Sequence, residues 1–113
     1  MAVLKSLLVA AIAGFAVAAH AQAQAQDDAA KYVQFVQENT GSCVQRNGVQ
    51  IQVRSTHATR RIKVWLDRYQ SGIGTGDRSR SELAPGAEPE PLGCSRGDAG
   101  PQEWRIVRAV FID

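Results

Sequence analysis

The sequence predicts an all-β fold, a small antiparallel β-sandwich or barrel, and three observations lead to this prediction. Alternating apolar and polar residues recur along the chain at a spacing of roughly 10–15 residues, as they do in short, half-buried strands. The segments between these runs are rich in Gly, Pro and Asn, which favour tight turns. The chain has 113 residues, enough for one domain and too few for a two-domain enzyme or a TIM barrel.

Residues 1–25 have the composition of a secretory signal peptide. One positive charge, Lys5, precedes an uninterrupted stretch of apolar and small residues from 7 to 19, and overlapping Ala-x-Ala sites follow. A charged start, a short apolar core and a small-residue exit are the three parts of an export signal. The core is shorter than the roughly 20 residues that a membrane-spanning helix needs. We therefore expect a periplasmic or secreted protein with no stable membrane insertion, cleaved after Ala25, with Ala21 and Ala23 as alternatives.

The domain left by this cleavage, residues 26–113, differs in composition from the whole chain. Of the 13 Lys and Arg residues only Lys5 is lost, while all 11 Asp and Glu residues are kept. The net charge therefore falls from +2 to +1, which is too small to indicate a nucleic-acid partner. His57 is the only histidine that remains.

Cys43 and Cys94 are the only cysteines of the chain, and we expect them to form one disulfide. Exported proteins meet an oxidising compartment, and two cysteines allow one intramolecular pairing. Their separation excludes the Cys-x-x-Cys spacing of thioredoxin-like redox pairs. Closing a loop of this length stabilises a small domain by about 4 kcal/mol in a chain-entropy account. Unpaired or reactive thiols are the alternative.

The first segment of the domain, residues 29–38, fits two conformations. Its apolar residues Ala29, Tyr32, Val33 and Val36 share one helical face, which favours a short N-terminal helix. The same residues, read as Tyr-Val-x-Phe-Val, are also typical of a strand. We favour the helix and keep the strand as the alternative.

The rest of the domain predicts strands joined by turns. A hairpin is expected over residues 44–53, because Asn47-Gly48 tolerates the positive φ angles of a type I′ turn. Residues 60–69 predict a strand that turns Ile62, Val64 and Leu66 inward. The remaining predictions are a glycine-rich loop at 70–76, an edge strand at 78–83, a Pro-Gly turn at 84–87, an edge or bend at 88–91, a turn-rich loop at 95–101 and a central strand at 104–112.

The tetrapeptide Leu83-Ala84-Pro85-Gly86 resembles the strand-end phrases of bacterial immunoglobulin-like modules. The resemblance covers these four residues and names no family. It implies that a sandwich, if formed, is immunoglobulin-like.

The domain lacks the residue sets that common enzymes use. His57 is the only available base of its kind, and no Gly-x-Ser-x-Gly elbow accompanies it. Zinc needs three or four nitrogen or sulfur ligands, which one histidine and two oxidised cysteines do not supply. The glycines at 72–76 resemble a phosphate loop but precede no helix. We expect no enzymatic activity, no cofactor and no metal.

The arginines are the unusual feature of the composition, since residues 26–113 hold ten Arg and two Lys. Strand alternation turns Arg61, Lys63, Trp65 and Tyr69 to the face opposite Ile62. Guanidinium groups bind carboxylate, phosphate and sulfate and stack on aromatic rings. These four residues are therefore the candidate binding face. The alternatives are that the N-terminal segment covers Trp65 and that the arginine content reflects codon usage.

These observations predict an exported, non-enzymatic binding domain of the cell envelope, with a protein or a glycan as its partner. Either the candidate binding face or the exposed sheet edge at 78–83 would make the contact. The alternative is a secreted or periplasmic enzyme inhibitor, similar to a lysozyme inhibitor, that presents a loop at 70–76 or 95–101.

Overall fold

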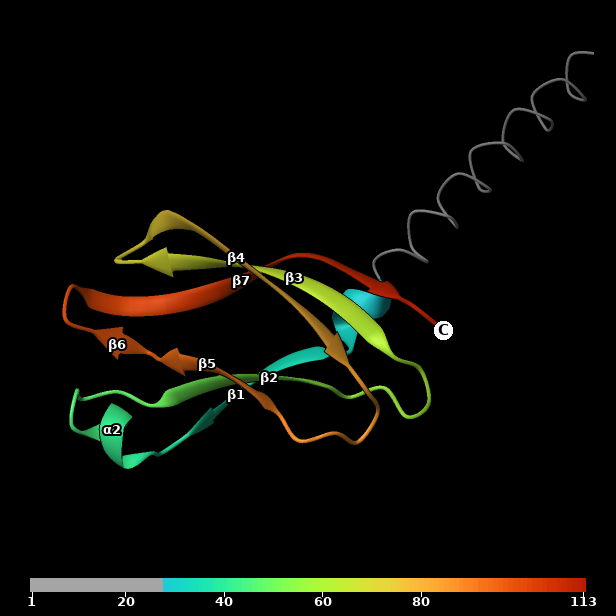
Figure 1. Ribbon diagram of the computed structural model, residues 1–113, viewed down its shortest axis with the longest axis horizontal. Helices are drawn as coiled ribbons and strands as arrows, with labels where there is room; N and C mark the ends of the chain where they lie inside the picture. The colour runs from blue at the N-terminus through green and yellow to red at the C-terminus, as the bar shows by residue number, and fades with distance from the viewer. Residues whose placement is uncertain (1–27) are drawn as a thin grey trace, which may run out of the picture.

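A computed structural model describes residues 28–113, and the export signal predicted for residues 1–25 lies outside them. The described chain begins with a helical turn at 28–31. Seven strands and one short helix follow in this part of the chain (Figure 1): β1 Val33–Glu38, α2 Gly41–Val44, β2 Gln50–Ser55, β3 Ile62–Gln70, β4 Ile73–Leu83, β5 Glu90–Cys94, β6 Arg96–Gly97 and β7 Gly100–Phe111. Among residues 28–113 no helix has the length and apolar character to cross a membrane.

The strands form two antiparallel sheets that lie as two layers (Figure 1). The smaller sheet has the order β1-β2-β5, and the larger sheet has the order β4-β3-β7-β6. The prediction of an all-β, antiparallel fold is therefore confirmed. Of the two architectures left open, the layered one is formed, because neither sheet closes into a barrel within the described residues.

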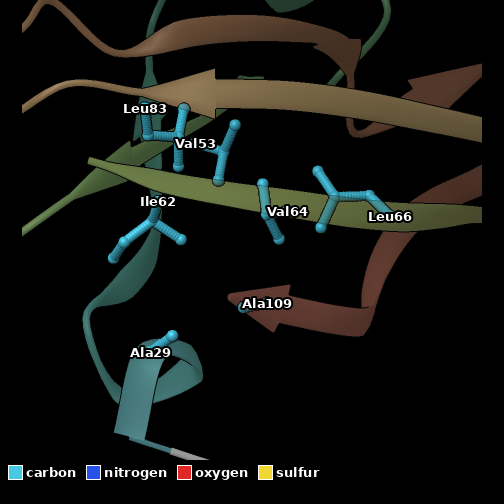
Figure 2. Close-up of a cluster of buried hydrophobic side chains, with 7 residues drawn as sticks. All are labelled: Ala29, Val53, Ile62, Val64, Leu66, Leu83 and Ala109. Atoms are coloured by element: carbon cyan, nitrogen blue, oxygen red, sulfur yellow. The ribbon is translucent and has the colours of Figure 1, made fainter. Parts of the chain in front are cut away.

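Strand β3 supplies more of the core between the layers than any other described strand. Its residues Ile62, Val64 and Leu66 are fully buried, as predicted, and they meet Val53 of β2 from the opposite sheet. Figure 2 shows these side chains gathered with the other members of the cluster, which are Ala29, Leu83 and Ala109. Burying one aliphatic side chain of this size stabilises the fold by about 1.5–3 kcal/mol.

The N-terminal segment divides between the two conformations that the sequence allowed. The helix favoured for residues 29–38 ends at 31, and the strand alternative is correct from Val33 onward. Six residues of β1 pair with β2, so Phe35 lies opposite Val53 and turns to the same inner side. This pairing with a distant strand outweighs the helical period of the segment.

The hairpin predicted for residues 44–53 is not formed. Residues 41–44 are helical, and β2 pairs with β1 and β5 instead of with its predicted neighbour. Asn47 does adopt a positive φ of 61°, where it ends the turn that follows α2. Gly48 is needed for close approach, because a Cβ atom there would lie 2.8 Å from Ser95 Oγ.

The loop predicted for residues 70–76 is mostly strand. Ser71 and Gly72 alone connect β3 to β4, with φ angles of 49° and 80°. Two successive positive φ angles are the signature of a tight hairpin turn whose twist matches that of its strands. Strand β4 is therefore longer than predicted, although it does lie at an edge of its sheet.

Of the remaining predictions, the Pro-Gly turn and the edge position of the segment with Pro91 are confirmed, whereas the loop predicted for residues 95–101 is wrong, because this segment forms β6, a tight turn and the start of β7. Ala87 N donates to Ala84 O across the Pro-Gly turn, and Gly86 has a φ of 69°. Strand β5, which carries Pro91, is the edge of the smaller sheet. Strand β7 lies between β3 and β6, but β6 pairs with it only at Gly100 and Pro101. The side of β7 away from β3 is thus largely unpaired within the described residues.

The predicted disulfide is present, and it ties α2 to the end of β5 at one end of the smaller sheet. It joins Cys43 of α2, which is 1% exposed, to Cys94 at the end of β5. The next residue, Ser95, exchanges hydrogen bonds with Val49 and accepts a third from the backbone of Gln102. This junction connects the smaller sheet to the start of β7.

We predict that loss of the disulfide destabilises the fold by about 2–5 kcal/mol, because the unfolded chain gains the freedom of a loop of about 50 residues. Urea denaturation of the oxidised protein and of the Cys43→Ser, Cys94→Ser double variant measures this difference. Reductant should lower the midpoint of the parent protein and leave that of the double variant unchanged. Equal midpoints for the two proteins without reductant would contradict the prediction.

Candidate functional site

The four residues of the candidate binding face lie on the outer side of the larger sheet. Because Ile62, Val64 and Leu66 are buried, strand alternation turns Lys63, Trp65 and Tyr69 to the opposite side. Arg61 precedes the strand and is exposed. We call the surface formed by the outward side chains of β4, β3 and β7 the outer face of the larger sheet.

Trp65 stands at the centre of this outer face, between two arginines. The register places Arg80 of β4 and Arg108 of β7 directly beside it on the two neighbouring strands. The Arg108 guanidinium carbon lies 5.1 Å from the centre of the indole ring, and Lys63 Nζ lies 5.2 Å from it. Two cations therefore lie over one half-buried aromatic side chain, and the register places a third, Arg80, on the strand beside it.

Tyr69 has a different environment. The guanidinium carbon of Arg105 lies 3.8 Å from the centre of its ring, which is stacking contact. Arg105 is itself held by a hydrogen bond of 2.7 Å to Glu103. The ring of Tyr69 is thus covered by a fixed arginine, whereas no cation near Trp65 comes as close.

A further ion pair crosses the outer face from β3 to β4. Arg78 donates two hydrogen bonds to Asp67, of 2.7 and 3.0 Å, one to each carboxylate oxygen. These hydrogen bonds, with the charge of Arg78, lower the pKa of Asp67 from its ordinary value of 3.8, against an opposing effect of partial burial. A bidentate pair of this kind fixes both side chains in direction.

The charges of the outer face are unevenly paired. Its three carboxylates each have one arginine partner: Asp67 with Arg78, Glu103 with Arg105, and Glu82 with Arg61 at 3.9 Å. Lys63 lies opposite Glu82 in the ladder, yet no ion pair joins them among residues 28–113. On the outer face, three cations have no carboxylate partner within the described part of the chain, namely Lys63, Arg80 and Arg108. They are the three that surround Trp65.

The described N-terminal residues do not cover Trp65. Ala29 is buried on the other side of the larger sheet, among Ile62 and Ala109 (Figure 2). The helical turn at 28–31 therefore packs on the core side of β3. The alternative in which the N-terminal segment covers the Trp65 ring is therefore not formed by the described residues.

Sequence reasoning missed the contribution of β7 to this surface. Arg105 and Arg108 are three positions apart, and side chains at that spacing face opposite sides of a regular strand. A bulge at Val107 shifts the register between Trp65 and Leu66, so both arginines reach the outer face. The sequence of β7 gives no sign of this bulge. It is seen only in the pairing of β7 with β3.

His57 supports the fold where it lies. Its Nδ1 atom accepts hydrogen bonds from the backbone N–H groups of Thr59 and Arg60, at 3.2 and 2.9 Å. Its ring packs edge-on against Tyr32 and Phe111. In the described residues no group of three or more His, Cys, Asp or Glu side chains is placed to hold a metal ion.

A second surface feature is an open cavity of about 310 Å³ between the layers. Its lining includes Phe35 of β1 and Trp104 of β7, with Ile51 between them. It opens between the two layers beside β1 and β7, each of which has a side without a full partner strand. Phe35 therefore remains partly exposed although it faces inward.

Comparisons with known proteins give no match, whether with family models, with curated proteins or with solved structures.

We predict that Arg78 keeps Asp67 ionised to lower pH. Because the pKa of Asp67 is lowered in the folded state, the pair stabilises the fold above the ordinary value of 3.8 and loses this effect as pH falls through the lowered pKa. NMR titration of the Asp67 carboxyl carbon should give a midpoint below 3.8, and Arg78→Gln should raise it. An unchanged midpoint in Arg78→Gln would show that the pair is not formed in solution.

Proposed function

We propose that the protein is an exported, non-enzymatic binding domain of the cell envelope, and that it binds its partner through the outer face of the larger sheet around Trp65. The observation that carries the proposal is the gathering of Lys63, Arg80 and Arg108, all without a carboxylate partner among residues 28–113, around this one aromatic side chain. We further propose that the layered fold is an immunoglobulin-like sandwich. The Pro-Gly turn after β4 and the two antiparallel layers support that assignment.

Export is part of the proposal. The composition of residues 1–25 is that of a signal peptide. The disulfide supports an oxidising destination, because such links persist mainly in exported proteins. We therefore propose the periplasm or the medium as the location of the domain.

The outer face suits binding by stacking and by charge together. An indole ring offers a flat apolar surface, and guanidinium groups on either side offer donors for anionic groups. The strands that carry these side chains are held by two long ladders. Rigid backbone under exposed side chains reduces the entropy that binding costs.

We predict that envelope material binds the domain through Trp65. The immobilised domain should retain a fraction of an envelope extract from the cells that produce it, and Trp65→Ala should lose that fraction. Arg54→Gln is the matched control, because Arg54 is an exposed cation on the outward side of the smaller sheet. Equal retention by all three proteins, or retention by none, would contradict the proposal.

A second candidate function is enzyme inhibition, and one observation favours it. The two turns that sequence analysis put forward as inhibitory loops lie side by side at one end of the larger sheet. Ser71 N donates to Pro101 O at 2.8 Å, and Ser71 Oγ donates to Ala99 O at 3.2 Å. Two turns fixed to one another form a rigid tip, which is the form in which many inhibitors meet an active site.

If this tip is inhibitory, the purified domain should reduce muramidase activity at near-equimolar concentration. Ser71→Ala loses the bond to Ala99 O and should weaken inhibition several-fold, whereas Arg54→Gln should not. Hydrolysis of cell walls by lysozyme, followed by turbidity, measures the effect. Full activity at a large molar excess of the domain would eliminate this candidate for muramidases.

A further inference from the structure

We infer that the ligand of the outer face is an acidic polysaccharide, whose sugar ring stacks on Trp65 and whose carboxylates pair with Arg80, Arg108 and Lys63. This inference rests on the proposed function and names the chemical class of its ligand.

The charges of the site favour a ligand with anionic groups. Arg80 and Arg108 flank Trp65 on the neighbouring strands, so their Cα atoms are about 10 Å apart across β3. Both side chains are exposed and have no carboxylate partner among the described residues. A carboxylate that approaches either one gains a charge-assisted hydrogen bond without breaking an existing pair.

The site offers a ring surface as well as charge. Trp65 and Tyr69 both lie on β3, but Arg105 stacks on Tyr69 at 3.8 Å and is held there by Glu103. The two cations near Trp65 lie more than 5 Å from its ring centre. Trp65 is thus covered less closely than Tyr69, and a ligand that stacks on its ring displaces Lys63 and Arg108, which lie over it.

The site favours an acidic sugar chain over other polyanions. An acidic peptide supplies carboxylates, but its acidic residues carry no ring that could cover the indole. A nucleic acid also supplies rings, but its negative charges lie on the phosphates of the backbone and not on the ring that would stack. A sugar acid combines a pyranose ring with a carboxylate on the same unit, and this matches a single aromatic side chain surrounded by three cations.

The surroundings of the site limit where the chain of sugars can run. Asp67, held by Arg78, bounds the site toward Tyr69, and Glu82 lies opposite Lys63 at the other side. The direction across the strands, from Arg80 over Trp65 to Arg108, carries no carboxylate in this row of the ladder. We therefore place the polysaccharide across the strands.

Calorimetric titration of the exported domain with oligogalacturonate, at low and at high salt, tests the inference. Cellohexaose serves as the uncharged sugar and decaglutamate as the acidic peptide. Oligogalacturonate should bind, more weakly at high salt because exposed charges are screened, and the two other probes should bind at least tenfold more weakly. Trp65→Ala and Arg80→Gln should each lower the affinity for oligogalacturonate about tenfold.

Arg54→Gln removes one cation from the smaller sheet and should change the affinity less than twofold. Arg80→Gln alters an exposed side chain only, so it remains informative if Trp65→Ala lowers the stability of the fold. No binding of oligogalacturonate, equal binding of decaglutamate, or equal losses in Arg80→Gln and Arg54→Gln would each overturn the inference.

The outcomes also separate this inference from the proposed function. If oligogalacturonate fails to bind while Trp65-dependent retention of envelope material persists, the ligand class is wrong and the binding surface stands. If retention does not depend on Trp65 either, both are wrong.

Discussion

The burial of one side of β3 is the constraint on which the rest of the molecule depends. Ile62, Val64 and Leu66 are fully buried, and no other strand contributes as many side chains to the core. Because side chains alternate along a strand, a shift of one residue would carry Lys63 and Trp65 into the core. The cost of burying a charged group forbids that shift. The register of β4 and β7 on either side of β3 follows from this choice, and the row of Arg80, Trp65 and Arg108 follows from the register.

The junction at Ser95 completes the fold where hydrophobic burial is thin. The smaller sheet contributes few fully buried side chains, chiefly Val53. It is held at one end by the Cys43–Cys94 link and by three hydrogen bonds of Ser95, two through its backbone and one through its hydroxyl. A domain of this size buries a smaller share of its surface than a larger one does, so such covalent and polar ties carry more of its stability.

The sequence predicts a strand well where its own residue pattern decides its conformation. It predicts a strand poorly where pairing with a distant strand decides it. Strand β3 was predicted in detail, since its alternation is complete and its burial is one-sided. The disulfide was predicted because two cysteines leave a single pairing. The sequence alone could not decide between helix and strand for residues 29–38, because their conformation depends on pairing with β2, which is distant in the sequence. The predicted hairpin at 44–53 failed for a similar reason, since Gly48 serves a close contact with Ser95 rather than a turn between paired strands.

The candidate site was likewise predicted only where the pattern of a single strand was sufficient. Alternation along β3 was sufficient to assemble Arg61, Lys63, Trp65 and Tyr69 on one face. It could not indicate that Arg105 covers Tyr69, nor that a bulge at Val107 brings Arg108 beside Trp65. The position of Arg108 relative to Arg105 depends on one extra residue in β7, and the alternation of apolar and polar residues does not indicate that residue.

The free side of β7 has a consequence for how the molecule behaves at high concentration. A long strand with an unpaired side invites a second molecule to add its own strand there, and aggregation then follows. The bulge at Val107 interrupts the straight row of backbone groups that such an addition requires. Arg105 and Arg108 on either side of the bulge would bring like charges together if two such strands met. Repulsion between these like charges would oppose the pairing of two such strands.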